Sequence, residues 1–262
     1  MRMIGIGAAG LRGQQLALET LGHNVANVST PGFKSDKVDF AEAFQASLAG
    51  ATTVNGAPIG APSVGPGSGV MISGMSNNFQ QGILVPSDSP WDLGIDGEGF
   101  FQVEMPNGTM AYTRAGSFEL DGEGTLVDPQ GNKVVVNNPQ NWDQIGTAEN
   151  IGVTANGTIT GSVSGTDQTF GTIQLVKFTQ PQGLTKIGGN LYLESANSGT
   201  PQIGDAQTEN YGTIRSKMLE QSNVDIASTM TDLIQAQRAY EMNSKVIQAG
   251  DEMWSIANTL RR

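Results

Sequence analysis

The chain of 262 residues contains no cysteine and one histidine, His23. Without cysteine it cannot form disulfide bonds, thiolate metal sites or a cysteine nucleophile, and a lone histidine has no second His or Cys with which to bind a metal. No stretch approaches the run of about 18 apolar residues that a membrane span needs, and residues 1–10 lack the apolar core of a cleaved secretory signal. These absences predict no metal, no cofactor, no membrane insertion and no cleaved signal peptide.

Basic charge is scarce in the middle of the chain. The net charge is −11, and residues 51–211 carry fifteen acidic and four basic side chains, whereas residues 1–50 carry four of each and residues 212–262 six of each. A nucleic-acid-binding protein needs a basic face for the phosphates, and this distribution offers none. We therefore expect no nucleic acid partner and interpret the acidic excess as a solvated surface.

Motifs of catalysis and of ligand binding are also missing. Gly5, Gly7 and Gly10 match the spacing of a dinucleotide fingerprint, but the strand and βαβ unit that such a site requires are absent, so close helix packing explains them better. No serine lies in a G-x-S-x-G context. Residues 121–125 resemble a calcium loop, yet Asn132 stands where the bidentate glutamate is needed, and a hairpin turn is the better interpretation. The sequence therefore predicts no enzyme.

The most regular pattern lies in residues 222–260, where apolar residues recur every seven positions in two adjacent rows without a proline. This pattern predicts a helix roughly 55 Å long, too long for a small domain to cover alone. Ser222 or Asn223 is the expected N-cap, and Asp225 is expected in the first turn. The first row is Ile226, Leu233, Tyr240, Ile247 and Trp254, and the second is Ala239, Val246, Met253 and Leu260.

Residues 4–28 repeat this design, and Pro31 and Gly32 predict that the helix ends near Asn27. Apolar seams at heptad spacing need partners. We therefore expect the two ends to pair as an antiparallel coiled coil and further copies of the chain to cover the remaining apolar surface. One N-terminal row is Ile4, Leu11, Leu18 and Val25, and the other is Gly7, Gln14, Leu21 and Val28.

The segment between the two ends has three parts. Phe40, Phe44 and Leu48, spaced four apart, predict a short helix over residues 35–48. Residues 49–69 hold no charge and are rich in Gly, Ala, Pro, Thr and Ser, which predicts an extended arm, either a passive linker or a contact arm. From residue 70 to about residue 211, short apolar runs alternate with turn pairs such as Asn107-Gly108 and Asn156-Gly157, which predicts an antiparallel sandwich or barrel-like sheet.

The expected architecture is a multidomain α+β fold. Long N- and C-terminal helices, packed as an antiparallel coiled coil, form a core domain from residues 1–32 and 220–262. Residues 33–85 connect it, through the extended arm, to a mainly antiparallel all-β domain that takes up residues 86–219 together with the return connection.

Several motifs resemble those of one known family. The N-terminal motif is Leu21-Gly-His-Asn-Val-Ala-Asn-Val-Ser-Thr-Pro-Gly-Phe-Lys34, and the C-terminal motifs are Glu220-Gln-Ser-Asn-Val-Asp225 and Asp232-Leu-Ile-Gln-Ala-Gln-Arg-Ala-Tyr-Glu-Met-Asn-Ser-Lys-Val-Ile247. Between them lie Gly94-Ile-Asp-Gly-Glu-Gly-Phe-Phe-Gln-Val103, Tyr112-Thr-Arg-Ala-Gly-Ser-Phe118 and Gly189-Asn-Leu-Tyr192. Together they resemble the axial proteins of the bacterial flagellum, the rod and hook family, over nearly the whole chain. The length and the low-charge arm favour the distal-rod type, with the proximal-rod and hook types as alternatives.

The resemblance implies a non-enzymatic building block that assembles helically into a hollow drive shaft, which transmits motor torque to the hook. The implied route is the flagellar type III export apparatus, and the implied location is the basal body in the cell envelope, outside the cytoplasm. Implied partners are further copies of the chain, other rod proteins, the hook protein, and the P- and L-ring proteins where present.

The expected site residues are packing and signature residues. The packing set is Ile4, Leu11, Leu18, Leu21, Val25, Ile226, Leu233, Tyr240, Ile247 and Trp254. The signature set is Asn24, Asn27, Thr30, Gly32, Phe33, Lys34, Ser222, Asn223, Gln237, Arg238, Ala239 and Tyr240. Two functions of other classes remain as alternatives: an extracytoplasmic adhesin or surface protein, and a β-sandwich hydrolase that acts on a polysaccharide.

Overall fold

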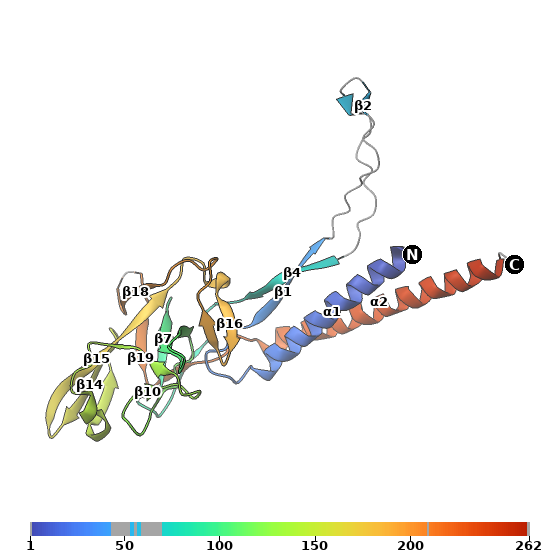
Figure 1. Cartoon of the computed structure of the whole chain (residues 1–262). Helices are drawn as coiled ribbons and strands as arrows, with labels where there is room; N and C mark the ends of the chain where they lie inside the picture. The colour runs from blue at the N-terminus through green and yellow to red at the C-terminus, as the bar shows by residue number, and fades with distance from the viewer. Residues whose placement is uncertain (1, 43–52, 55–56, 59–69, 209, 261–262) are drawn as a thin grey trace. The chain divides into compact units, whose positions relative to one another are not determined.

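The computed structural model describes residues 2–42, 53–54, 57–58, 70–208 and 210–260. The chain divides into two compact units (Figure 1). The first, here called the helical unit, comprises Met1–Val25, Asp36–Ser76 and Ile226–Arg262, and the second, the β unit, comprises Ala26–Ser35 and Asn77–Asp225. Terminal helices and a mainly antiparallel middle confirm the predicted α+β class. The chain crosses between the units after residues 25, 35, 76 and 225, whereas the predicted boundaries follow residues 32, 85 and 219.

The helical unit contains α1 (Arg2–Ala26) and α2 (Ile226–Leu260), which lie side by side (Figure 1). A Cβ atom added to Gly7 would lie 2.9 Å from Ile247, and one added to Gly10 would lie 2.8 Å from Asn243. The residue numbers of the contact positions decrease along α2 as they increase along α1, so the two helices are antiparallel. Their backbones approach closely because no side chain stands on α1 at these two points. The predicted end of α1 near Asn27 is confirmed.

The start of α2 differs from the prediction in detail. The helix begins at Ile226, so neither Ser222 nor Asn223 lies directly before it, and Asp225 precedes the first turn. The side chain of Asn223 instead binds backbone groups of the β unit, as described below. Among the described residues, neither helix carries a stretch apolar enough to cross a membrane.

A two-stranded ribbon of β1 (Asp36–Glu42) and β4 (Val70–Asn77) completes the described part of the helical unit, with β2 (Thr53–Val54) and β3 (Ala57–Pro58) pairing beyond it. The predicted helix over residues 35–48 is therefore wrong for residues 36–42, and residues 43–48 lie outside the described residues. Val38 and Phe40, two apart, share one strand face, and the Phe40 ring lies over Gly13 of α1. Pairing of these residues with β4 outweighs the helical preference that the four-residue spacing of Phe40 and Phe44 indicated. Apart from β2 and β3, the predicted arm also lies outside the described residues.

The β unit is built on β15 (Thr166–Lys177), a 12-residue strand that pairs with β7, β12, β14 and β18. All the register pairs of its large sheet are antiparallel, as predicted. The other strands of that sheet are β7 (Phe100–Glu104), β8 (Met110–Thr113), β9 (Glu119–Leu120), β10 (Leu126–Val127), β11 (Lys133–Val134), β12 (Val136–Asn137), β13 (Glu149–Val153), β14 (Thr158–Val163), β16 (Thr185–Gly188), β17 (Leu191–Leu193) and β18 (Gln202–Asp205).

Two smaller pairs and two short helices complete the β unit. β5 (Leu84–Pro86) pairs with β20 (Met218–Glu220), and β6 (Leu93–Asp96) pairs with β19 (Thr213–Ser216). The 3-10 helices are η1 (Trp142–Thr147) and η2 (Pro181–Gly183). The predicted turn over residues 121–125 is confirmed as the hairpin between β9 and β10, where Asp121 Oδ1 accepts the N–H groups of Glu123 and Thr125.

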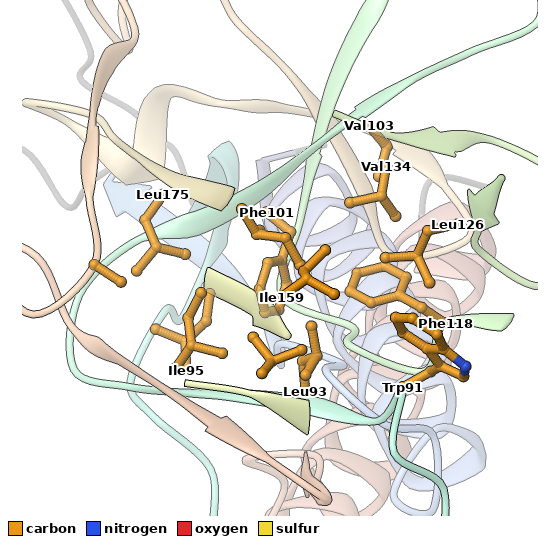
Figure 2. Close-up of a cluster of buried hydrophobic side chains, with 14 of the residues drawn as sticks. Trp91, Leu93, Ile95, Phe101, Val103, Phe118, Leu126, Val134, Ile159 and Leu175 are labelled. Atoms are coloured by element: carbon orange, nitrogen blue, oxygen red, sulfur yellow. The ribbon is translucent and has the colours of Figure 1, made fainter. Parts of the chain in front are cut away.

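Two apolar clusters are packed in the β unit. Phe101 and Val103 of β7 belong to the larger one, in which side chains from strands far apart in the sequence point toward one another (Figure 2). Phe100, whose side chain leaves the same strand on the opposite face, belongs to the smaller one. The smaller cluster contains Phe100, Tyr112, Val176, Phe178, Leu184 and Tyr192, with Phe79 packed against it. The sheet therefore buries apolar residues on both faces and has its own core.

Candidate functional site

The candidate assembly surface is the set of exposed apolar side chains of α2, which lie at several positions around the helix. A helix of 35 residues places several large apolar side chains in solvent, and their relative exposure ranges from 39 to 66 %. An isolated protein rarely keeps so many large apolar side chains exposed on one element without a partner. The exposed set is Ile226, Met230, Ile234, Tyr240, Met242, Val246, Met253, Trp254 and Ile256.

The two helices also differ in length. α1 has 25 residues and α2 has 35, and the contacts at Gly7 and Gly10 set their register. Continued along the helices, this register places the start of α1 opposite about residue 252 of α2. The last residues of α2, including Trp254 and Ile256, therefore extend past α1, as Figure 1 shows, and both side chains are at least half exposed.

The predicted packing residues lie in several environments. Those of α1 whose side chains are described, Leu11, Leu18, Leu21 and Val25, are half-buried, and so are Leu233 and Ile247 of α2. Ile226, Tyr240 and Trp254 are exposed, with 47, 40 and 51 % of their surface accessible. The side chain of Ile4 lies outside the described residues.

A second feature, within the β unit, joins segments that are far apart in the sequence. We call residues 32–35, 78–82 and 220–223 the signature junction. Lys34 is completely buried, and its Nζ donates a hydrogen bond to Glu220 Oε1 at 2.6 Å and another to the Gln80 carbonyl at 2.7 Å. The Gly82 N–H donates to the same carboxylate oxygen at 2.8 Å, and the Gly32 N–H donates to the Glu220 carbonyl at 2.7 Å. A charge this deeply buried needs such a set of partners.

Arg114 brings a second cation to the junction. Its Nη1 lies 3.7 Å from Glu220 Oε2, its Nη2 donates to the Gly97 carbonyl at 2.8 Å, and its guanidinium lies over the Phe100 ring. Burial lowers the pKa of Lys34, opposed by Glu220 and reinforced by the charge of Arg114. Burial also lowers the pKa of Arg114, and the carboxylates of Glu220 and Glu98 oppose the shift. Glu220 is thus the carboxylate that lies between two buried cations.

Asn223 ties the three segments of the junction together. Its Nδ2 donates to the carbonyls of Asn78 and Gln80 at 2.7 and 3.0 Å, and its Oδ1 accepts the Ser35 N–H at 2.9 Å. The Asn78 N–H in turn donates to the Ser35 carbonyl at 2.8 Å. Each of these segments lies within three residues of a point where the chain passes between the units.

The other N-terminal signature residues have local structural roles. Asn24, buried within the helical unit, exchanges two hydrogen bonds with the backbone of Asp36 at 2.8 and 2.9 Å and so aligns the start of β1 with the end of α1. In the β unit, the Thr30 hydroxyl donates to Asn27 Oδ1 at 3.2 Å. Gly32 has a φ of +67°, and a Cβ there would lie 2.4 Å from the backbone nitrogen of Ala115, so only glycine fits. The Lys186 ammonium lies over the buried Phe33 ring, 4.6 Å from the ring centroid.

A cavity of about 390 Å³ in the β unit is the candidate small-molecule site. Phe79, Phe100 and Phe178 form the aromatic part of its lining. Of the charged groups in its wall, Lys177 Nζ lies 2.5 Å from Glu98 Oε2, and Arg114 is the buried cation of the signature junction. The lining residues show no catalytic set. Among the described residues, the candidate functional features are therefore a surface and a buried junction.

Comparison with known proteins identifies the family. Residues 4–34 match the model of the flagella basal body rod protein, residues 94–161 that of the flagellar hook protein FlgE/F/G D1 domain, and residues 215–260 that of the flagellar basal body rod FlgEFG protein C-terminal region. The flagellar basal-body rod protein FlgG of Borreliella burgdorferi is 36% identical over 100% of this chain and 99% of its own length. FlgG of Bacillus subtilis is also 36% identical, over all of both chains. The chain belongs to the FlgG family of flagellar basal-body rod proteins.

Membership of the FlgG family makes the chain a structural subunit of the flagellar rod and not an enzyme. A more distant relative, the flagellar hook-basal body complex protein FlhP of Bacillus subtilis, is 28% identical over 94% of each chain. This assignment replaces the two alternatives of another class, a surface adhesin and a polysaccharide hydrolase.

The three regions that match the FlgG family models meet at the signature junction. Lys34 comes from the first matched region, Arg114 from the second and Glu220 from the third. Glu220 and Arg114 were not among the predicted site residues, although both stand in the quoted motifs. The usable signal was Lys34 itself, because a lysine that is buried, as its neighbour Phe33 is, requires a carboxylate partner.

The remaining C-terminal signature residues of this FlgG-family chain lie mostly on the outside of α2. Gln237, Arg238 and Tyr240 are exposed, and Ala239 is half-buried. Ser222 lies before the helix, where its hydroxyl accepts the Val224 N–H at 3.3 Å. These residues differ from Lys34 and Asn223, which are already engaged within the β unit.

Proposed function

We propose that this FlgG-family subunit is of the distal-rod type and polymerises helically with copies of itself into a hollow shaft that transmits torque to the hook. The exposed apolar side chains of α2 carry the proposal, because they recur from Ile226 to Ile256 along a 35-residue helix. Burying an apolar side chain of this size contributes about 1.5–3 kcal/mol each. Several such side chains per subunit suffice to drive assembly.

The proposed packing is an antiparallel coiled coil of α1 and α2 whose uncovered seams contact neighbouring subunits. One apolar row of α2 recurs every seven residues, and on a straight helix each successive member is displaced by about 20° around the helix axis. Its members are Ile226, Leu233, Tyr240, Ile247 and Trp254. The row therefore begins, at Ile226, about 60° from the direction of Ile247, the member nearest to α1, and ends, at Trp254, only about 20° from it but past the end of α1. Its ends are available to a second copy.

The wider setting follows from family membership. We propose export through the flagellar type III apparatus, residence in the basal body outside the cytoplasm, and contacts with other rod proteins, the hook protein and the P- and L-ring proteins where present. In the unassembled chain the helices have few partners, so their folding is proposed to be completed on assembly.

Polymerisation of the purified full chain tests the proposal. Leu233→Ala removes a half-buried α2 side chain and should abolish polymers in electron micrographs, since such a truncation in an assembled core costs about 2–5 kcal/mol. Ile203→Ala, which alters an exposed apolar residue of the β unit, is the matched control and should polymerise normally. Circular dichroism should show an unchanged β signal in both variants. Equal polymerisation of both variants would refute the role of α2.

A further inference from the structure

Three of the exposed apolar side chains of α2 are methionines, and two of them, Met242 and Met253, lie on one side of the helix. Met242 is 66 % exposed and Met253 is 50 % exposed, and Val246, at 39 %, lies between them. With about 100° of rotation per residue, the three side chains fall within about 40° of one another. We call these three residues the methionine stripe.

The stripe faces away from α1. Ile247 and Asn243 mark the side of α2 that contacts α1, through Gly7 and Gly10. On a helical wheel the centre of the stripe lies about 120° from Ile247 and about 80° from Asn243, and the exposure of its side chains shows that α1 does not cover it. No described residue covers these side chains in the structure, and in the assembled shaft proposed above we assign their burial to a neighbouring copy.

The chemistry of the stripe differs from that of the isoleucines elsewhere on the surface. The chain has no cysteine, so thioethers are its most readily oxidised side chains. A peroxide transfers one oxygen to the sulfur: the O–O bond breaks, an S–O bond forms, the thioether loses two electrons and the peroxide leaves as water or an alcohol. The product sulfoxide is polar and is restored by methionine sulfoxide reductases.

We propose that the methionine stripe is an oxidation-sensitive site that controls assembly. The inference rests on the proposed polymerisation through α2. A peroxide oxidises Met242 and Met253 in the unassembled subunit, and the sulfoxides then oppose burial against a neighbour because they bring a polar group into an apolar contact. In the polymer the same side chains are covered, so assembled subunits resist the oxidant.

The test compares the full chain with a double variant, Met242→Leu with Met253→Leu. Leucine has nearly the volume of methionine but no sulfur, so the variant should polymerise like the unchanged chain. Met110→Leu, on β8 of the β unit and 39 % exposed, is the matched control. Each purified monomer is treated with hydrogen peroxide, freed of oxidant, and assayed for its critical concentration by sedimentation, with peptide mass spectrometry to locate the sulfoxides.

We expect peroxide to raise the critical concentration of the unchanged chain and of Met110→Leu roughly tenfold or more, and methionine sulfoxide reductase to restore it. The double variant should keep its critical concentration, and preformed polymers should keep Met242 and Met253 reduced. Equal inhibition of the double variant, or normal polymerisation of a chain oxidised at both positions, overturns the inference alone. Failure of the untreated chain to polymerise overturns the proposed function and this inference with it.

Discussion

Replacing Glu220 by glutamine keeps the shape of the side chain and removes its negative charge. In the folded β unit this carboxylate lies 2.6 Å from the ammonium of Lys34 and 3.7 Å from the guanidinium of Arg114. Lys34 and Glu220 have no exposed side-chain surface, and 5 % of the Arg114 side chain is exposed. The substitution therefore leaves two buried cations close together without their carboxylate.

The expected loss of stability is large because water cannot replace the missing charge. Removal of one partner from a buried ion pair typically costs about 3–5 kcal/mol. A domain is stable by only about 5–15 kcal/mol, so Glu220→Gln should remove a large part of the stability of the β unit. Adding Lys34→Met to this variant removes one of the stranded cations and should recover part of the loss, since apolar replacement of buried ions is often tolerated.

The assay is urea denaturation with tryptophan fluorescence in a Trp254→Phe background. The chain has three tryptophans, and the remaining two, Trp91 and Trp142, both report on the β unit. The matched control is Asp96→Asn, which breaks the ion pair to Arg215 at 3.2 Å, where both side chains are about half exposed. An exposed pair contributes about 0–1 kcal/mol, so the control should scarcely move the transition.

The reasoning fails if Glu220→Gln costs no more than Asp96→Asn. It also fails if the double variant is as unstable as the sum of the two single variants, because the cost would then not come from stranded charge.

Two further predictions concern the β unit. Burial, with the carboxylate of Glu194 adding to it, raises the pKa of Tyr112 above its ordinary value of 10.0. The unfolded chain then binds fewer protons between pH 10 and the folded pKa, so the contribution of Tyr112 to stability is complete below about pH 10 and lost as the pH rises. As the pH rises above about 10, Tyr112→Phe should lose less stability than the unchanged chain in urea titrations. A chain that ends at Asp225 should show a cooperative thermal unfolding transition of the β unit. A chain that ends at Gly212 should not, because it lacks β19, β20 and Glu220. Similar transitions in both chains would contradict the role of these strands in stabilising the β unit.

The elements that the sequence predicted well are those decided by neighbouring residues. The seven-residue rows and the absence of proline predicted α2, and Pro31 with Gly32 predicted the end of α1. Short apolar runs between turn pairs predicted the β unit, where Gly108 and Gly157 adopt positive φ in their turns.

The elements that the sequence missed depend on distant residues. The spacing of Phe40 and Phe44 suits a helix, but residues 36–42 form a strand because they pair with Val70–Asn77. Lys34 and Glu220 meet across 186 positions of sequence, a contact that no local pattern can reveal. Asn223 was expected to cap α2 because asparagine favours that position, yet its amide binds backbone groups near residues 35 and 78.

The signature junction also has a mechanical consequence. Ser35, Asn78 and Asn223 stand beside three of the chain crossings into the β unit, and hydrogen bonds join them directly. Force applied along one of these three crossings is therefore distributed over all three backbone segments by hydrogen bonds within the β unit. The three segments resist shear together, because one of them cannot move without loading the other two.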